Sequence, residues 1–548
     1  MIKLLPKNTG KFFSRTAGLT TFAAVAGLGL GYKYDEGTRR SLQFWYNIFP
    51  LYVTYRSVQF LNRDTKFITD EYANEVYESL HEKYSDEVRE NVYLMRGFYL
   101  KQAQMMSTQD DFVPAAYMRW VKDTQDNVPS EFSGSQAREY AAAKMKEEQG
   151  LEFDEIFEYW DDTPLGVASI GQVHKAVLRK NHEVVAVKIL VPGIEDRFRS
   201  DIRTLRAFCK LAMPQHVSGF AEIEKQFLTE FDYRAEADNL SRVRANVLPK
   251  WSDKVNIPRP HTDLCSRHIL VMEYLHGVKL VDGILRGLEK VAAVQGKTAT
   301  ELLEEQKAKM TSGKFEFRSL EENKTQSKQM RGLITLYDCL LTCNPLRLLY
   351  NCSPIRLVTG PAKYVWTPMP VDLGSILELL CRVEGNQIFQ DGLFNGDCHP
   401  GNILLLEDGR LGLIDYGQVK AMTIDERIKY AKLIIAHNRR DKNEVVRIHF
   451  DEMGTVTTKR DVDTAYLFSA FWNDRNTPDV CGDMNIASFI DYLEERDSMV
   501  KLPEEYIFAA RVSVLLRGMG KAFGLNLRMS EMWKSEAELF LKSQNIDY

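Results

Sequence analysis

Three oxygen-bearing side chains follow one another within GDCHPGNILLLEDGRLGLIDYGQ, the stretch of residues 396–418. Asn402 follows Asp397 by five positions, and Asp415 follows Asn402 by thirteen. The amide of Asn402 and the carboxylate of Asp415 offer the hard oxygen ligands that Mg²⁺ prefers, and bound Mg²⁺ neutralises phosphate charge. The carboxylate of Asp397 can orient a hydroxyl group or accept its proton. The spacing therefore predicts phosphoryl chemistry, with Asp397 as the catalytic group and Asn402 and Asp415 as metal ligands.

A short loop and a lysine upstream could hold the phosphates of a nucleotide. Residues 166–171 read GVASIG, and Lys188 lies in the apolar run VVAVKIL. An alanine stands where a GxGxxG pattern has its middle glycine, and its Cβ narrows the approach of backbone N–H groups to phosphate. We expect the loop to cover the nucleotide with altered phosphate placement. The loop residues expected to contact the nucleotide are Gly166, Ala168, Ser169 and Gly171.

A small sheet and a hairpin must position these groups. The runs VHKAVLR and EVVAVKILV are rich in β-formers and are separated by KNH, which predicts a hairpin. RHILVMEYLHG predicts a further strand that ends at Gly277, and amphipathic helices are expected over 194–212 and 220–247. In the segment 402–417 the tripeptide EDG predicts a turn between two strands. Residues 371–548 are otherwise helical in pattern, so the chain is predicted to be α+β.

The order of loop, lysine, aspartate, asparagine and DYG resembles that of protein kinases. ASIGQVHKA, VAVK, EFDYRAEADN, HPGN and DYGQ further resemble the UbiB family of atypical kinases, also called aarF-domain kinase-like proteins, over roughly residues 85–540. KYDEGTRRS at 33–41 is similar to the mitochondrial branch of that family. The resemblance implies a two-lobed protein kinase-like fold with an N-terminal helical extension and a mostly helical C-lobe that carries an insertion.

The resemblance also implies roles for further residues. Lys188 would grip the α- and β-phosphates and pair with Glu236, and backbone groups around Glu273 and Leu275 would read adenine. ATP or ADP and Mg²⁺ are the implied cofactors. The family's first two loop alanines are replaced here by Gly166 and Val167, which leaves the nucleotide preference open.

A second signature lies in the extension. Lys101 and Gln104 match the family motif KxGQ, with Ala103 in place of glycine, and Glu230 and Asp232 match its ExD motif. These four residues are the implied regulatory set. We expect Lys101 Nζ to lie about 2.7–3.2 Å from an acidic oxygen of that pair. A regular helix would turn Glu230, Asp232 and Glu236 in different directions, so a break near Asp232 is expected.

The chain is divided by pattern into four segments. Residues 1–62 are expected to be a targeting or membrane-associated segment, 63–160 the helical extension, 161–278 the N-lobe, and 279–548 the C-lobe with an insertion at about 287–370. The first 34 residues are basic and lack acids, as in a mitochondrial transit peptide. The uncharged stretch 17–32 is shorter than the roughly 20 residues of a membrane span. The aromatic stretch 42–61 suits a membrane interface, so we expect a mitochondrial protein at the inner membrane.

Composition narrows the function further. The net charge of −5 does not suggest a nucleic-acid partner, and none of the eight cysteines forms a CxxC motif. The resemblance implies an ATP-binding, Mg²⁺-dependent kinase or ATPase of mitochondrial lipid or coenzyme Q metabolism or distribution. The expected partners are a nucleotide, a membrane lipid or quinone-related small molecule, and the mitochondrial membrane.

Two alternatives stay open. The first is a conventional serine/threonine protein kinase, although FNG precedes Asp397 where such kinases have His-Arg before the aspartate. It is also disfavoured because QVKAMTIDERIKY runs from DYG directly into a helical pattern, without a long activation loop. The second is a non-catalytic, nucleotide-gated membrane scaffold, which the complete set of Asp397, Asn402 and Asp415 disfavours.

Overall fold

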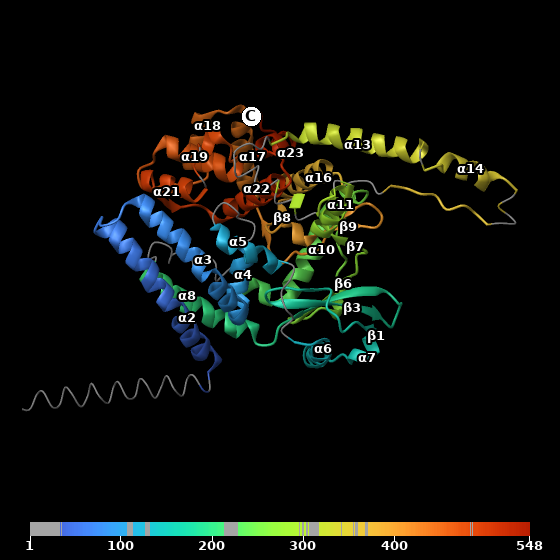
Figure 1. The fold of residues 1–548 in the computed structure, drawn as a ribbon, viewed down its shortest axis with the longest axis horizontal. Coiled ribbons are helices and arrows are strands. Elements are labelled where there is room, and N and C mark those ends of the chain that lie inside the picture. The colour runs from blue at the N-terminus through green and yellow to red at the C-terminus, as the bar shows by residue number, and fades with distance from the viewer. Residues whose placement is uncertain are drawn as a thin grey trace, which may run out of the picture. The chain divides into compact units, whose positions relative to one another are not determined.

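The computed structural model describes residues 33–548 with the exception of 34, 107–112, 126–131, 213–227, 295, 299–300, 303–304, 306–316, 341, 355, 357–359, 368–370, 483 and 485. The basic leader and the stretch 17–32 therefore lie outside the described residues. The chain forms two compact units (Figure 1). The first comprises residues 1–235 and 261–272, and the second comprises residues 236–260 and 273–548.

The first unit is built on an antiparallel sheet in the order β1-β3-β4-β6, with β2 paired to β3. Its strands are β1 (Phe157–Trp160), β2 (Gly166–Val167), β3 (Gly171–Leu178), β4 (Val184–Leu190) and β6 (Ile269–Glu273). β3 and β4 form the hairpin that the KNH turn predicts, with Val173 opposite Lys188. Alternate residues of β3 are buried, and one face of the sheet packs on Met145 of α6 (Gly134–Gln149).

Helices surround this sheet. They are α2 (Glu36–Gln59), η1 (Phe60–Asp64), α3 (Asp70–Met95), α4 (Gly97–Met106), α5 (Ala115–Val121), η2 (Lys122–Gln125), α6, α7 (Phe153–Ile156), α8 (Ile194–Ala212), η4 (Thr229–Phe231) and η5 (Thr262–Leu264). Figure 1 shows α2 beside both α3 and α8. A buried ion pair of 2.6 Å joins Arg40 of α2 to Asp201 of α8, and Phe44 meets Phe208 edge-on.

The aromatic stretch 42–61 thus lies mostly in α2, where it contributes to the packing of the first unit. Phe44 and Leu51 are buried, whereas Tyr46 and Phe60 are exposed. Across the described ranges, no helix combines the length and apolarity that a membrane crossing requires.

The second unit is mostly helical. Its helices are α10 (Tyr233–Trp251, which begins in the first unit), α11 (Leu280–Val294), α13 (Leu320–Leu340), α14 (Asn344–Cys352), α16 (Leu373–Asn386), η6 (Gln387–Asp391), η7 (Pro400–Asn402), α17 (Ile424–Arg439), α18 (Lys442–Arg447), η8 (Ile448–Glu452), α19 (Val462–Asn473), α20 (Pro478–Cys481), α21 (Ile486–Arg496), α22 (Glu504–Ala522) and α23 (Met529–Ser543). Trp533 of α23 is fully buried against Phe389 and Tyr430, and its Nε1 donates to the Cys381 carbonyl oxygen at 2.9 Å.

Three small sheets complete the second unit. The strands are β5 (Val255–Asn256), β7 (Gly277–Lys279), β8 (Leu393–Asn395), β9 (Ile403–Leu406), β10 (Leu411–Leu413), β11 (Val419–Ala421), β12 (Val456–Thr457) and β13 (Met499–Lys501). They pair in the order β5-β10-β9-β7, with separate pairs β11-β8 and β12-β13. β9 and β10 are the hairpin predicted around EDG, and Gly409 in its turn has φ +88°.

Three sequence-based expectations need correction. The strand predicted to end at Gly277 is two strands, because β6 ends at Glu273 and Gly277 begins β7 in another sheet. The sheet begins at Phe157, before the expected boundary at 161. The strand β11 stands between DYG and α17, where the sequence predicts that the chain runs directly into a helix. In each case tertiary pairing or packing decides a boundary that local composition leaves ambiguous.

The two glycines of the 166–171 loop should differ in their tolerance of a side chain. A Cβ on Gly171 would lie 2.5 Å from Tyr233 Oη and 2.6 Å from the Ile189 carbonyl oxygen, whereas a Cβ on Gly166 would meet nothing within 4 Å. We expect Gly171→Ala to lower the free energy of unfolding by about 1–3 kcal/mol because β3 and β4 must move apart. Gly166→Ala, the matched control, should change it by less than about 0.5 kcal/mol. Chemical denaturation measures both, and equal midpoints would contradict this packing.

Two buried histidines should make the second unit acid-sensitive. Burial lowers the pKa of His437 in α17 and of His449 in η8 to about 4, against about 6.5 for an unfolded chain. The unfolded state therefore binds more protons between these values, and stability falls as pH falls from about 6.5 towards 4. The loss should be on the order of 1–2 kcal/mol per histidine at pH 5. Urea denaturation of the parent and of His437→Gln/His449→Gln between pH 7 and pH 5 tests this. An unchanged pH slope in the variant would show that other groups are responsible.

Candidate functional site

The loop 166–171 is a tight β-turn region between β2 and β3. Gly166 pairs with Val173 and Val167 pairs with Gln172, and Ala168 N–H donates to the Gly171 carbonyl oxygen at 2.7 Å. Ser169 is buried within the turn. The N–H of Ala168 is therefore engaged inside the turn, so any phosphate contact of this loop must come from other groups. The altered phosphate placement expected from the sequence stays a prediction.

Lys188 projects from β4 towards an aromatic ring. Its Nζ lies 5.1 Å from the ring centroid of Tyr233, which is buried. A cation over an aromatic face is stabilised electrostatically. Glu236 is also buried, and its Oε2 lies 3.8 Å from the position that a Cβ on Gly417 would take, next to the DYG turn. The expected pairing of Lys188 with Glu236 stays a prediction.

Lys101, in the helical extension, forms the expected contact with an acid of the ExD motif. Its Nζ lies 3.2 Å from Glu230 Oε2, and both side chains are mostly buried. The distance lies at the upper end of the predicted range and confirms that expectation. Gln104, three residues on in α4, donates from Nε2 to the Thr124 carbonyl oxygen at 2.8 Å and so ties α4 to η2.

Asp232, the second acid of the ExD motif, bonds a residue two positions away in the sequence. Its carboxylate accepts from Arg234 at 2.6 Å and 2.9 Å, and these hydrogen bonds lower the pKa of Asp232. The cause is backbone geometry: η4 ends at Phe231, Asp232 is extended with φ −133° and ψ 98°, and α10 begins at Tyr233. The break expected near Asp232 is confirmed, and it separates the direction of Asp232 from that of Glu230.

Asp397, Asn402 and Asp415 are joined by one hydrogen-bond network. Asn395 at the end of β8 accepts from Asp397 N–H at 3.0 Å and donates to the Asp415 carbonyl oxygen at 2.8 Å. Asn402 Nδ2 donates to the Asp397 carbonyl oxygen at 3.3 Å. The Asp415 carboxylate accepts from Gly417 N–H at 3.0 Å, which fixes the DYG turn. The sequence-predicted catalytic and metal residues therefore lie together in the second unit.

This donor set fits Mg²⁺. The amide of Asn402 directs its nitrogen to a backbone carbonyl, so its oxygen is the atom suited to a cation, and Asp415 adds a carboxylate. Mg²⁺ is commonly held by one or two protein oxygens and completes its shell with phosphate and water. α10 supports the same turn, because Asn239 Nδ2 donates to the Tyr416 carbonyl oxygen at 3.1 Å.

Arg511 is a member of this network that the sequence analysis missed. It lies on α22, donates to Asp397 Oδ1 at 2.9 Å, and donates to Gln418 Oε1 at 2.6 Å. A guanidinium group with two acceptors at fixed positions orients both of them. No local signal could have identified it, since Arg511 stands 114 residues from Asp397 in a helix without a recognised motif.

The GQVH stretch has a structural role that the sequence analysis also missed. Gln172 and His174 are fully buried neighbours on one face of β3, with Gln172 Nε2 2.8 Å from His174 Nε2. His174 Nδ1 lies 2.8 Å from the Asp161 carbonyl oxygen, and its ring stacks on Trp160. Burial lowers the pKa of His174, so the ring is neutral at pH 7. These contacts hold the strand that follows the loop.

The expected adenine-reading segment is held by arginine contacts. Glu273 N–H donates to the Arg259 carbonyl oxygen at 2.9 Å, and Glu273 Oε2 accepts from Arg259 N–H at 3.1 Å. Leu275 is buried against Gly412 of β10. Adenine recognition by the backbone around Glu273 and Leu275 stays a prediction.

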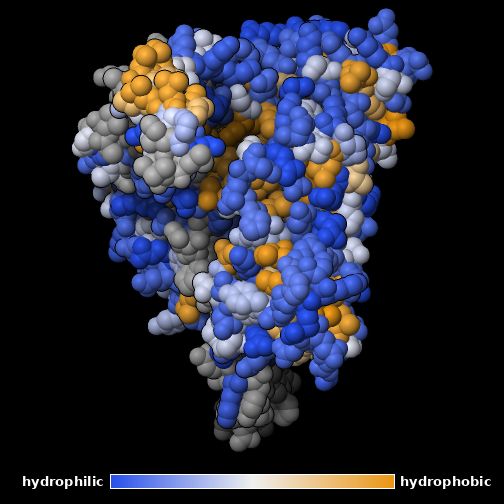
Figure 2. Space-filling model, turned by 90° about the vertical axis from the view of Figure 1, so that its right-hand side faces the viewer, coloured by the Kyte–Doolittle hydropathy of each residue, from blue (hydrophilic) through white to orange (hydrophobic). Residues whose placement is uncertain are grey.

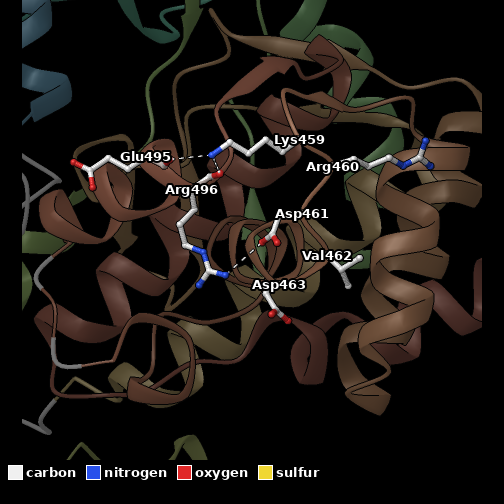
Figure 3. A pocket seen from close by; sticks show the side chains of 7 residues that line it. All are labelled: Lys459, Arg460, Asp461, Val462, Asp463, Glu495 and Arg496. Carbon is white, nitrogen blue, oxygen red and sulfur yellow. Dashed lines mark hydrogen bonds and ion pairs between the residues drawn. The ribbon is translucent and has the colours of Figure 1, made fainter.

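A surface hollow elsewhere in the second unit contains none of these residues (Figure 3). Several of its charged groups already have partners: Lys459 Nζ donates to the Arg496 carbonyl oxygen at 2.5 Å, Arg496 lies 3.8 Å from Asp461, and Arg460 pairs with Asp451. A hollow whose charges are already paired offers little to a phosphate. Its lining residues are Lys459, Arg460, Asp461, Val462, Asp463, Glu495 and Arg496.

The chain is similar to a known domain family and to several known proteins. The ABC1 atypical kinase-like domain matches residues 124–311 and 367–449. A probable protein kinase UbiB of Aeromonas salmonicida is 32% identical over 192 residues, which are 34% of each chain. A probable protein kinase UbiB of Pseudomonas aeruginosa is 25% identical over 370 residues, 64% of this chain and 52% of its own. The chain thus spans a third to a half of the length of these UbiB relatives.

Two further similarities extend over more of the chain. The uncharacterized protein sll1770 of Synechocystis is 23% identical over 505 residues, 89% of this chain and 70% of its own. The structure of the Rv3197–erythromycin complex from Mycobacterium tuberculosis aligns with 88% of this chain and 98% of its own, with TM-score 0.42 and 17% identity.

The matched domain includes Lys188, Asp397, Asn402 and Asp415, and the α+β elements around them agree with a protein kinase-like fold. Sequence identity to the UbiB relatives supports the same family assignment independently of the domain match. Motifs, fold and relatives therefore agree, and the chain belongs to the UbiB family of atypical kinases.

Proposed function

We propose that this protein is a mitochondrial UbiB-type kinase or ATPase that binds ATP or ADP with Mg²⁺ and acts in lipid or coenzyme Q metabolism or distribution. The observation that carries the proposal is the network in which Asn395 joins the backbones of Asp397 and Asp415. It presents a carboxylate base and two oxygen ligands from adjoining strand ends. The relatives named protein kinase UbiB support the kinase-like part of the proposal.

Each residue then has a stated task. Lys188 pairs with the α- and β-phosphates, while Asn402 and Asp415 hold Mg²⁺, which would neutralise phosphate charge during transfer. Asp397 orients the attacking hydroxyl or water. Arg511 holds the Asp397 carboxylate in place through its 2.9 Å hydrogen bond and is a positioning residue.

Two observations favour this over a conventional protein kinase. First, β11 begins at Val419 and pairs with β8, and α17 begins at Ile424, so a long activation loop does not follow Gly417. Secondly, the extension carries the Lys101–Glu230 ion pair. We propose that this pair biases the enzyme towards a small molecule or water as phosphoryl acceptor. The acceptor itself, and the expected association with the inner membrane, belong to the same proposal.

Asp415 should be required for binding of Mg²⁺-nucleotide. Asp415→Asn removes the charge of the proposed ligand, and we expect affinity for Mg²⁺-ATP to fall at least about tenfold, with loss of turnover. Asp408→Asn is the matched control, because Asp408 stands in the β9–β10 turn and bonds Arg410. Calorimetric titration and phosphate release measure both quantities. Parent-like Mg²⁺-ATP binding by Asp415→Asn would refute the metal assignment.

Lys101 should influence which reaction occurs. Lys101→Ala leaves the buried Glu230 carboxylate without its 3.2 Å partner, and we expect a changed ATP/ADP preference or increased self-phosphorylation in a folded protein. Lys144→Ala is the control, since that half-buried lysine likewise pairs with a glutamate, Glu147 of α6. Nucleotide affinities, radiolabel incorporation and a thermal unfolding scan distinguish the outcomes. If both variants match the parent in all three, Lys101 has no regulatory role.

A further inference from the structure

Residues 317–367 form an addition to the kinase-like domain, which we call the arm. The family match stops at residue 311 and resumes at 367, so the arm lies between its two parts. The arm consists of α13, α14 and a return segment, residues 360–367. Figure 1 shows α13 leading outward from the neighbourhood of α16, with α14 at its far end. None of the proposed site residues lies in it.

The base of the arm is fixed to the second unit. Lys324 Nζ lies 2.8 Å from Glu378 of α16, and a Cβ on Gly374 of α16 would lie 2.7 Å from Asn323. The backbone of Arg318 accepts from Asn526 N–H and donates to the Gly524 carbonyl oxygen, each at 3.1 Å. The direction of the arm is therefore set by several contacts on both sides of its first helix.

The arm exposes large apolar side chains along most of its length. On α13, four of them follow the i, i+3, i+4, i+7 spacing of a single helix face. They are Leu333, Leu336, Tyr337 and Leu340, each more than half exposed. On α14 the exposed group is Leu346, Leu348 and Leu349. Figure 2 faces the side on which the arm projects and shows hydrophobic residues gathered on the surface near the top.

Polar contacts, and not an apolar core, hold the distal arm together. Asn344 donates to the Val365 carbonyl oxygen at 2.6 Å and accepts from Val365 N–H at 3.0 Å. Asn351 forms the same pair of bonds with Ala362, at 2.9 and 2.7 Å. Asp338, which is fully buried, accepts from Thr367 N–H and Oγ1 at 2.8 and 2.5 Å. Hydrogen bonds from these three side chains thus hold the return segment, and the leucines of α13 and α14 are exposed.

Beyond the first turn of α13, which carries Glu321 and Glu322, the exposed charges of the arm are positive. Between residues 323 and 371 the sequence contains a single acidic residue, Asp338, whose carboxylate is buried. The same stretch contains Lys324, Lys328, Arg331, Arg347, Arg356 and Lys363. The chain as a whole has a net charge of −5, so the arm is a basic region of an acidic protein. Tyr364 and Trp366 add a stacked pair of exposed aromatic rings.

We propose that the arm docks the protein on a bilayer that contains anionic phospholipids. The outward leucines enter the interfacial layer, the basic side chains contact phosphate headgroups, and Tyr364 and Trp366 lie at the boundary. This use of the arm is independent of the proposed reaction.

The geometry favours a bilayer over a protein groove as the occupant. Leu346 and Leu349 lie about 60° apart on one face of α14, whereas Leu348 lies about 100° from Leu349 and about 160° from Leu346, so exposed leucines stand on two sides of the helix. A groove that binds an amphipathic helix covers one stripe only. A fluid lipid surface accommodates apolar side chains on several sides, and residues 323–367 carry no exposed acid that would repel anionic headgroups.

The test uses the full chain and vesicles of two compositions, phosphatidylcholine alone and phosphatidylcholine mixed with phosphatidylglycerol. We expect co-sedimentation to be stronger with the anionic vesicles. Leu346→Ser/Leu349→Ser and Arg356→Glu/Lys363→Glu should each weaken binding about tenfold or more. Leu539→Ser and Lys534→Glu, exposed positions on α23, are the matched controls and should bind as the parent does. Turnover without vesicles should be unchanged in all four variants.

A second measurement reports insertion of the arm itself, even if other segments of the protein also bind lipid. Brominated phosphatidylcholine in the anionic vesicles should quench tryptophan fluorescence more in the parent than in Trp366→Phe. Equal quenching, parent-like binding of the arm variants, or no binding to either vesicle would overturn the proposal. Arm variants that keep vesicle binding but change the mass measured by light scattering would assign the arm to a protein contact, and would also overturn it.

Discussion

The arrangement of the phosphoryl-transfer residues depends on one buried amide. Asn395 accepts from the backbone of Asp397 and donates to the backbone of Asp415, and so holds two segments that the β9–β10 hairpin separates. The bonds are shielded from water because Asn395 is buried, and each is stronger there than at the surface. Arg511 and Asn402 then add bonds to Asp397, and Asn239 adds one to Tyr416. These hydrogen bonds fix the backbone that carries Asn402 and Asp415, and so they position the oxygen atoms proposed to bind Mg²⁺.

The loop before Lys188 illustrates a different constraint. The strands β2 and β3 turn so tightly that Ala168 N–H bonds the Gly171 carbonyl oxygen, and Gly171 has no room for a Cβ. Glycine is needed at 171 for close packing, and not for an unusual φ. At Gly166 there is space, so the glycine there is not demanded by packing. A nucleotide would meet a compact turn whose N–H groups are partly committed, unlike the open loop of a GxGxxG kinase.

In the arm, side-chain hydrogen bonds to the backbone hold the segments together, and apolar side chains stay exposed. Asn344 and Asn351 satisfy backbone groups of the return segment in the manner of a paired strand. Because those bonds hold the return segment in place, the leucines of α13 and α14 need not face inward. Contiguous exposed apolar surface on a chain of this size marks an interaction site more often than chance. The basic character of the arm narrows the chemistry of what it meets.

Some features followed from the sequence alone because they depend on local geometry. The β3–β4 hairpin, the EDG turn and the break at Asp232 follow from residue alternation, turn chemistry and helical angles, each of which acts over a few residues. The Lys101–Glu230 contact was accessible through resemblance to a family, and its distance agrees with that expectation.

Other features were decided only by tertiary structure. Arg511 reaches Asp397 from a helix 114 residues away, and no pattern near either residue signals it. The apolar run 267–277 divides between two sheets, since pairing partners and not composition determine where a strand ends. Hydrophobic periodicity could not predict that the apolar face of the arm is exposed. An amphipathic pattern indicates which residues share a helix face, but it does not indicate whether that face packs on the protein or lies at the surface.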